Sequence, residues 1–293
     1  MNKLAPFIGF IEQKKAAIFV GAGISKIAGC SDLQAIRGKL SEIKIVREKI
    51  ESQSPEAIPT KELIAFCKSI CNKSEDDRRA YEGIMRESLT FEPDKFSREY
   101  LPFIKKLKQV EPFPSIMTTN VDDCLAKTRE FDLTKIYYKN SDMRTELFQR
   151  IGIFHIHGYI EDTAGQVWDL FDYQERYGLV DFKEFIINTF KEHSVLFLGY
   201  AFIGDDELKQ LISVAKKENT QPKMHFALLP SDEPHPHINE TMYKELFNIQ
   251  IVRYGSKNDF IKLFSEWIDS NFNPAAMGKD DEISHMPFIA EGA

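Results

Sequence analysis

The chain has 293 residues, of which 43% are hydrophobic and 28% are charged, proportions typical of a globular protein with a packed core. The formal net charge of -7 disfavours direct nucleic-acid binding, because nonspecific affinity for phosphates comes from lysine and arginine. No apolar run approaches the roughly 20 residues that span a bilayer. The four cysteines are too few and too scattered for a disulfide framework. We therefore expect a cytoplasmic protein with reduced thiols and no membrane association.

Short apolar runs alternate with longer helical patterns, which is typical of parallel strands joined by crossover helices. Helical periodicity is clearest over residues 205–217 and 259–268. We predict an α/β fold built on a Rossmann-like, doubly wound and mainly parallel sheet. The predicted strands are residues 17–20, 115–118, 135–138, 152–157, 195–198, 225–229 and 249–253.

The connection between the first two predicted strands is much longer than an ordinary βα loop. Residues 32–111, approximately, carry amphipathic helical patterns and predict a helical insertion after the first strand. From residue 273 to the end no periodicity is clear, which predicts a flexible tail. The expected organisation is one catalytic domain over residues 1–272, insertion included, followed by the tail at 273–293.

A glycine-rich turn, GAGIS, follows the first predicted strand and comprises Gly21, Ala22, Gly23, Ile24 and Ser25. Glycines at such a turn allow the backbone to approach a pyrophosphate closely. As a dinucleotide fingerprint the turn is incomplete, because lysine stands at the position of the third glycine. A tight strand-to-helix turn without a ligand explains the motif equally well.

The segment TTNVDD follows the second predicted strand and contains Asn120 and Asp122. Ligands of open parallel sheets bind at the carboxyl ends of the strands, so both residues are expected to face the same crevice as Gly21. Helix capping is the alternative, because asparagine and aspartate are favoured caps.

The segment HIHG closes the predicted strand at 152–157, and alternation would place His155 and His157 on the same side of it. At the strand end, His157 is suited to orient or deprotonate a ribose hydroxyl or a water. For His155 we expect a hydrogen-bonded structural role. A metal is not expected, because no further ligands follow nearby in sequence.

The segment FLGYAFIGDDEL is a strand, a glycine turn with Gly199 and Tyr200, and a helix that begins with acidic residues. Acidic residues there stabilise a helix without any ligand, and one could equally hold a ribose hydroxyl. The sequence does not separate Asp205 from Asp206, and Asp205 is taken as the candidate.

In this order, GAGIS, TTNVDD, HIHG and FLGYAFIGDDEL resemble the sirtuin-like domain family over most of the chain, from about residue 16 to 268. The resemblance implies a Rossmann-like domain with NAD as substrate and with Asn120 and His157 as catalytic residues near the nicotinamide. It implies a cofactor-binding set made up of Gly21, Ala22, Gly23, Ser25, Asp32, Asp122, Gly199, Tyr200 and Asp205.

Two departures separate the chain from the deacylases of this family. The two CxxC pairs of their zinc module are absent from the sequence, and GCSDLQ, which contains Asp32, has Gln34 where their GIPDFR pattern has arginine. The resemblance is closer to bacterial sirtuin-like NADases of phage defence, which implies NAD hydrolysis to nicotinamide and ADP-ribose. It also implies a homo-oligomer or a separate protein, such as a HerA-type ATPase, as regulator.

The expected chemistry is dissociative: nicotinamide leaves, water captures the ribose cation, Asn120 positions the ribose or the water, and His157 assists deprotonation. The alternatives are an NAD-dependent protein deacylase and a noncatalytic subunit that senses NAD or ADP-ribose. A nuclease acting with an ATPase is weakly supported, because no clustered metal-binding acids stand out.

Overall fold

The computed structural model describes residues 2–50, 58–132, 135–162, 165–202, 204–232 and 238–273. The predicted tail at 273–293 lies, from residue 274 onward, outside these residues. The centre of the molecule is a seven-stranded sheet in the order β3-β4-β2-β1-β5-β6-β7, and every pairing in it is parallel. The strands are β1 (Ala16–Val20), β2 (Ser115–Thr118), β3 (Ile136–Tyr137), β4 (Ile153–His155), β5 (Ser194–Leu198), β6 (His225–Pro230) and β7 (Ile249–Tyr254). The predicted α/β fold and its parallel sheet are confirmed.

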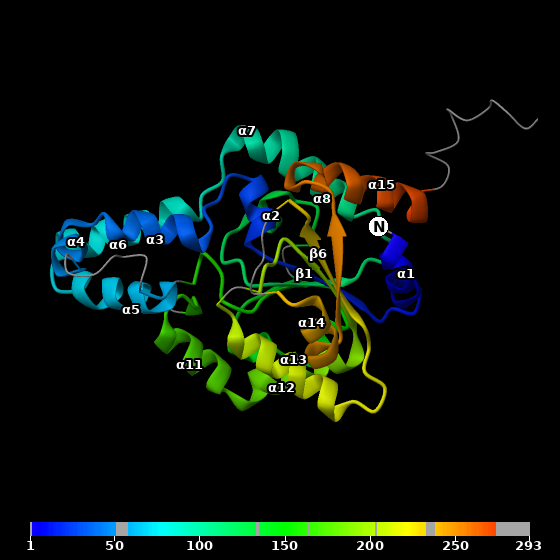
Figure 1. The fold of residues 1–293 in the computed structure, drawn as a ribbon. Coiled ribbons are helices and arrows are strands. Elements are labelled where there is room, and N and C mark those ends of the chain that lie inside the picture. Colours follow the sequence, from blue (N-terminus) through cyan, green and yellow to red (C-terminus); the bar gives the residue numbers. More distant parts are fainter. Residues whose placement is uncertain are drawn as a thin grey trace, which may run out of the picture.

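Helices cover both faces of the sheet (Figure 1), which explains why its central strands are apolar throughout. Ile18 and Val20 of β1 pack toward one face, and Ala17 and Phe19 pack toward the other. The first face is covered by α1 (Ala5–Glu12), α2 (Ala22–Ile27), α8 (Leu101–Leu107) and α15 (Phe260–Phe272). The second face is covered by α11 (Leu170–Gly178), α12 (Val180–Glu192), α13 (Asp206–Glu218) and α14 (Glu240–Phe247).

The helices with the clearest sequence periodicity bury the residues that the pattern selects. In α13, the buried side chains are Leu208, Leu211, Ile212 and Ala215. In α15, Phe260, Phe264 and Trp267 are buried and stack in sequence along the helix. These apolar stripes attach both helices to the sheet.

The helical region predicted between the first two strands is present, and it divides into two parts. The first part projects from the sheet (Figure 1) and has a hydrophobic core of its own. It consists of α3 (Leu33–Ser41), α4 (Lys44–Ile50), α5 (Thr60–Cys71) and α6 (Glu75–Ser88). The second part returns to the sheet through α7 (Pro93–Lys95), a π-helical turn at Phe96–Tyr100 and α8.

Lysines of α5 attach the projecting helices to the rest of the molecule. Lys61 forms an ion pair with Glu207 of α13, with 2.8 Å between Nζ and Oε2. Lys68 bridges Asp169 and Asp172 at the start of α11, at 3.0 and 2.9 Å. Asp169 is itself the N-cap of α11 and accepts hydrogen bonds from two backbone N–H groups of that helix. The helical region and the segment after β4 are therefore coupled by charge.

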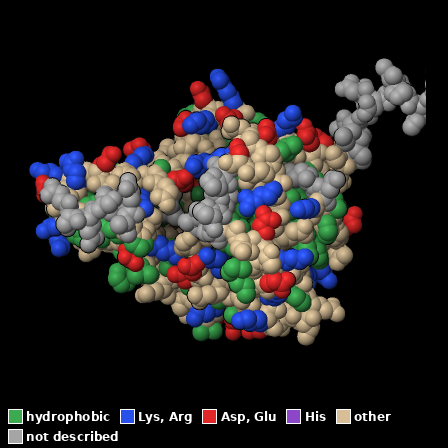
Figure 2. Space-filling view, viewed as in Figure 1, with side chains coloured by type: hydrophobic (Ala, Val, Ile, Leu, Met, Phe, Trp, Pro, Cys, Tyr) green, Lys and Arg blue, Asp and Glu red, His purple; other side chains and the backbone are tan. Residues whose placement is uncertain are grey.

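The surface in the view of Figure 2 shows acidic and basic side chains interspersed, without a large area of one sign. In the part of the chain that the structure describes, no helix combines the length and apolar character that a membrane crossing requires.

The strand order determines where a ligand can be held. From β1 the chain continues to its neighbour β2, whereas from β5, on the other side of β1, it continues away to β6. Adjacent strands whose connections leave in opposite directions create a crevice beyond their carboxyl ends, where open α/β sheets bind ligands. The segments after β1, β2, β4 and β5 meet at this edge and carry most of the predicted site residues.

Candidate functional site

The glycine turn after β1 packs directly on the turn after β5. Gly21 and Gly23 donate backbone hydrogen bonds to Leu198 and Gly199, both at 2.9 Å. A Cβ on Gly21 would lie 2.5 Å from the oxygen of Gly199, and one on Gly23 would lie 2.8 Å from the same atom. Gly199 itself has φ +61°, a conformation that favours glycine. Close approach of the two turns therefore requires glycine at these positions, with or without a bound phosphate.

Asn120 links the turn after β2 to the glycine turn. Its Nδ2 donates to the oxygen of Gly21 at 3.0 Å and to Ser25 Oγ at 2.8 Å. Because the carbonyl of Gly21 can only accept, this contact fixes which end of the amide is nitrogen. The amide oxygen remains an acceptor that no described residue uses. The structure thus brings together Gly21, Ser25 and Asn120.

The two histidines of HIHG do not share one side of a strand, contrary to the sequence expectation. Strand β4 ends at His155, and the chain turns before Gly158, which has φ +87°. His155 Nδ1 lies 2.7 Å from the backbone oxygen of Asn120. His157 instead faces α11, and its Nε2 lies 2.9 Å from the hydroxyl of Tyr177. The glycine turn ends the alternation on which the expectation depended.

His157 lies in a nearly closed aromatic environment. It is 3% exposed, and Tyr173 and Tyr177 pack edge-on against its ring. Burial, followed by the positive charges of Lys61 and Arg176, lowers the pKa of His157 well below 6.5. The imidazole is therefore neutral at pH 7 and has one nitrogen able to accept a proton.

Burial distinguishes the two acidic residues that follow β5, Asp205 and Asp206. Asp205 is 4% exposed, accepts a hydrogen bond from the Tyr200 hydroxyl, and has an Oδ1 with no hydrogen-bond partner among the described residues. Burial raises the pKa of Asp205 to about 6, and the hydrogen bond from Tyr200 partly opposes this. Asp206 is exposed and pairs with Lys209. Asp205 is therefore the member of the pair that faces the interior.

Tyr200 contacts both the glycine turn after β1 and the Asp205 carboxyl. It packs on Phe19 of β1, and its backbone lies within 2.7 Å of where a Gly21 side chain would begin. Its hydroxyl binds Asp205, and burial, then the charge of Asp205, raises its pKa well above 10. Tyr200 therefore stays protonated and donates to Asp205 at any ordinary pH.

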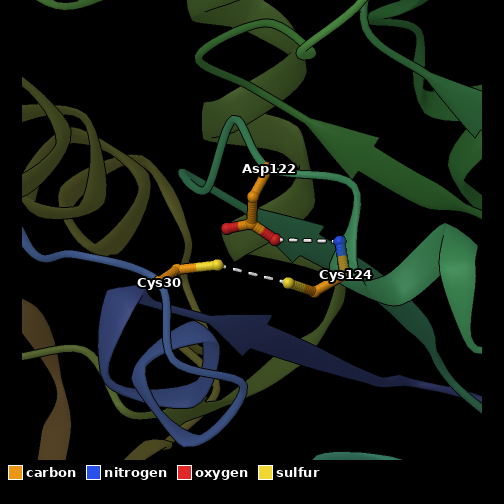
Figure 3. Close-up of side chains that lie close together, drawn as sticks. All are labelled: Cys30, Asp122 and Cys124. Atoms are coloured by element: carbon orange, nitrogen blue, oxygen red, sulfur yellow. Dashed lines mark hydrogen bonds between the residues drawn. The ribbon is translucent and has the colours of Figure 1, made fainter. Parts of the chain in front are cut away.

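Two of the predicted cofactor-binding residues have local partners that account for them. Asp32 is the N-cap of α3, accepts from the backbone N–H of Ala35 at 2.8 Å and pairs with Lys26. Asp122 accepts from the backbone N–H of Cys124 at 3.0 Å (Figure 3). Ala22 begins α2, directly after Gly21. Ligand contacts of Asp32 and Asp122 remain predictions.

Sequence reasoning missed Lys61, whose Nζ lies 3.2 Å from the centroid of the Tyr173 ring. It lies in the helical region, far along the chain from the motifs, and no local pattern indicates its position. Tyr173 and Tyr177 are separated by one helical turn, so α11 presents both to His157. Their spacing was the available signal for this aromatic wall.

Comparison with known proteins concerns the part of the chain that runs from β2 to β7. The sequence model of a family described as the SIR2-like domain matches residues 114–252, which run from β2 to β7 and include Asn120, His157 and Asp205. The helical region and β1 precede the match. No curated protein matches the chain. Residues 114–252 are therefore similar to a SIR2-like domain, and this similarity suggests NAD-consuming hydrolase or deacylase chemistry with NAD as substrate.

Proposed function

We propose that the chain is an NAD glycohydrolase that cleaves NAD to nicotinamide and ADP-ribose. The observation that supports the proposal is that three buried polar side chains, those of Asn120, His157 and Asp205, lie in the segments that follow the carboxyl ends of β2, β4 and β5, within the residues that match a SIR2-like domain. Buried polar groups without full hydrogen bonding are costly, and a polar substrate would compensate that cost.

Asn120 is the proposed positioning group for the ribose or the attacking water. Its Nδ2 is held by Gly21 and Ser25, so the amide oxygen is presented in a fixed orientation. An oriented acceptor can hold a water or a ribose hydroxyl against the anomeric carbon as nicotinamide leaves.

His157 is the proposed general base. Nδ1 can accept a proton from water only in the tautomer in which Nε2–H donates to the Tyr177 hydroxyl. Tyr177 therefore acts as a positioning residue that selects this tautomer. The burial of His157 against two tyrosines favours a small co-reactant such as water over an acylated peptide.

Asp205 is the proposed acceptor for a ribose hydroxyl. Its Oδ2 is held by Tyr200 and its Oδ1 lacks a partner among the described residues. A hydroxyl that donates to Oδ1 would satisfy the orphaned atom and orient the ribose within the crevice.

The proposed cellular role is NAD depletion in antiviral (phage) defence, by a cytoplasmic chain acting as a single catalytic domain with a helical insertion. Regulation by homo-oligomerisation or by a HerA-type ATPase is part of the same proposal, because the motifs of the chain resemble those of bacterial sirtuin-like NADases. These points stay predictions.

The decisive experiment is incubation of purified protein with NAD and no peptide, followed by chromatography of nicotinamide and ADP-ribose. Asn120→Ala and His157→Ala are expected to abolish product while the far-ultraviolet dichroism spectrum stays native, and Asp206→Asn is the active control. Product formed at the native rate by either alanine variant would remove that residue's role. NAD consumption only with an acyl-lysine peptide would identify a deacylase, and NAD binding without turnover would identify a noncatalytic sensor.

A further inference from the structure

The turns after β1 and β2 bring two cysteines and an aspartate together in the interior. Cys30 lies beyond α2, Asp122 lies between β2 and the short helix α9 (Cys124–Lys127), and Cys124 is the first residue of α9. The sulfur atoms of Cys30 and Cys124 are 3.4 Å apart (Figure 3). One ligand atom from each of the three residues lies within 4.8 Å of the others, and all three residues are buried.

We propose that Cys30, Asp122 and Cys124 form a binding site for a thiophilic divalent cation of the zinc class. Thiolate and carboxylate are both zinc ligands, and three protein ligands leave the fourth position of a tetrahedron for water. The proposal does not depend on the proposed NAD chemistry, because metal binding by these three residues can be measured without NAD.

The spacing of the sulfurs fits a shared metal better than a covalent bond. Two thiolates at 2.3 Å from one tetrahedral zinc are separated by roughly 3.8 Å. The sulfur atoms of Cys30 and Cys124 are 3.4 Å apart, so they would have to move slightly away from each other to bind one zinc. A disulfide would require the same atoms to approach to about 2.05 Å.

Backbone contacts around the cluster already hold the ligands in position. The N–H of Cys30 donates to Ser25 at 3.1 Å, and Asp122 accepts from the N–H of Cys124 at 3.0 Å. Preorganised ligands reduce the ordering that metal binding must impose. A bound cation would join the segment after α2 to the segment after β2, which also contains Asn120.

Protons must leave when the metal enters. Cys30 and Cys124 share a hydrogen bond between their sulfur atoms, which requires at least one of the two sulfurs to carry a proton. The Zn–S bonds replace the two S–H bonds, and two protons pass to solvent for each zinc bound, without oxidation or reduction.

The other two cysteines provide the matched control. Cys67 and Cys71 of α5 are also buried and close in sequence, but they lie in the core of the projecting helices. Among the residues that the structure describes, only the cluster of Cys30, Asp122 and Cys124 has three such ligand atoms within reach of one another.

The test uses the full chain, reduced and freed of metal with a chelator, and titrated with Co²⁺ and then Zn²⁺. We expect one cobalt per chain with a thiolate charge-transfer band in the near ultraviolet, displacement by zinc, and release of about two protons per metal. Cys30→Ser and Cys124→Ser should lose the band, and Asp122→Asn should weaken binding at least tenfold. Cys67→Ser should retain the native titration.

Three results would overturn the proposal. The first is a native chain that gives no charge-transfer band and releases no protons, a measurement that needs no variant to fold. The second is equal loss of the band in Cys67→Ser and in Cys30→Ser. The third is a metal-free chain in which thiol titration and mass spectrometry identify a reducible Cys30–Cys124 disulfide and metal does not bind after reduction.

Discussion

Replacing Asp205 with asparagine should stabilise the fold while weakening NAD binding. Burial raises the pKa of Asp205 from its ordinary value of 3.8 to about 6. At 1.36 kcal/mol for each pKa unit, the charged Asp205 carboxylate destabilises the native state by about 3 kcal/mol. Asparagine keeps an oxygen for the Tyr200 hydroxyl and avoids the charge. We therefore expect Asp205→Asn to gain about 2–3 kcal/mol of unfolding free energy at pH 8.

The pH dependence follows from which state holds the proton. Between pH 3.8 and about 6 the native state keeps the Asp205 proton and the unfolded chain loses it, so this group's contribution to stability falls as pH rises. Above about pH 6 both states are ionised and the difference is constant. The advantage of Asp205→Asn over the native protein should therefore be small near pH 4, grow through this window and level off above it.

Urea unfolding at pH 4.5, 6 and 8 measures this difference, with Asp206→Asn as the control. Lys209 lowers the pKa of Asp206 through a hydrogen bond, so its replacement removes a favourable contact and should give no gain at any pH. Calorimetry of NAD binding should show Asp205→Asn at least tenfold weaker than the native chain, because a charged acceptor is lost. Equal stability of Asp205→Asn and the native protein at pH 8, or a gain independent of pH, would refute the reasoning.

Three further outcomes follow from the packing and hydrogen bonds of the site. Gly21→Ala should lower the urea unfolding free energy by about 1–3 kcal/mol, because its Cβ would lie 2.5 Å from the oxygen of Gly199; native stability would contradict this packing. Tyr177→Phe should reduce kcat about tenfold with little change in KM, because loss of the hydroxyl removes the contact that keeps the proton of His157 on Nε2. An unchanged pH–rate profile would contradict that role. Lys68→Met should increase hydrogen exchange in α5, because the ion pairs to α11 are lost, and an unchanged exchange pattern would show that apolar packing alone holds α5.

The sheet could be predicted from sequence because its strands are buried on both faces. The run at Ser115–Thr118 was predicted with its observed bounds, and the strands at Ala16–Val20 and Ile249–Tyr254 differ from prediction by one residue at an end. The strand at Ile153–His155 was predicted too long, because the apolar pattern continues through Ile156 although the backbone turns toward Gly158. Periodicity reports burial, and it does not report where pairing with a neighbouring strand stops.

The site could be predicted only where its groups follow a strand directly. Asn120 and Ser25 meet because parallel strands end at one edge of the sheet, a rule that needs no side-chain detail. The choice between Asp205 and Asp206 depended on the direction in which the first turn of α13 faces. The approach of Lys61 to Tyr173, and that of Cys30 to Cys124, depends on tertiary packing between segments far apart in sequence.

The contact between the glycine turns has a consequence for how such sequences evolve and are recognised. Gly21 and Gly23 are required by the oxygen of Gly199, which belongs to the protein itself. A descendant that no longer bound NAD would still need both glycines to keep β1 beside β5. Selection for folding alone would therefore preserve the motif. Loss of these glycines in a homologue would indicate a rebuilt sheet edge, whereas their retention would be compatible with an inactive pseudoenzyme.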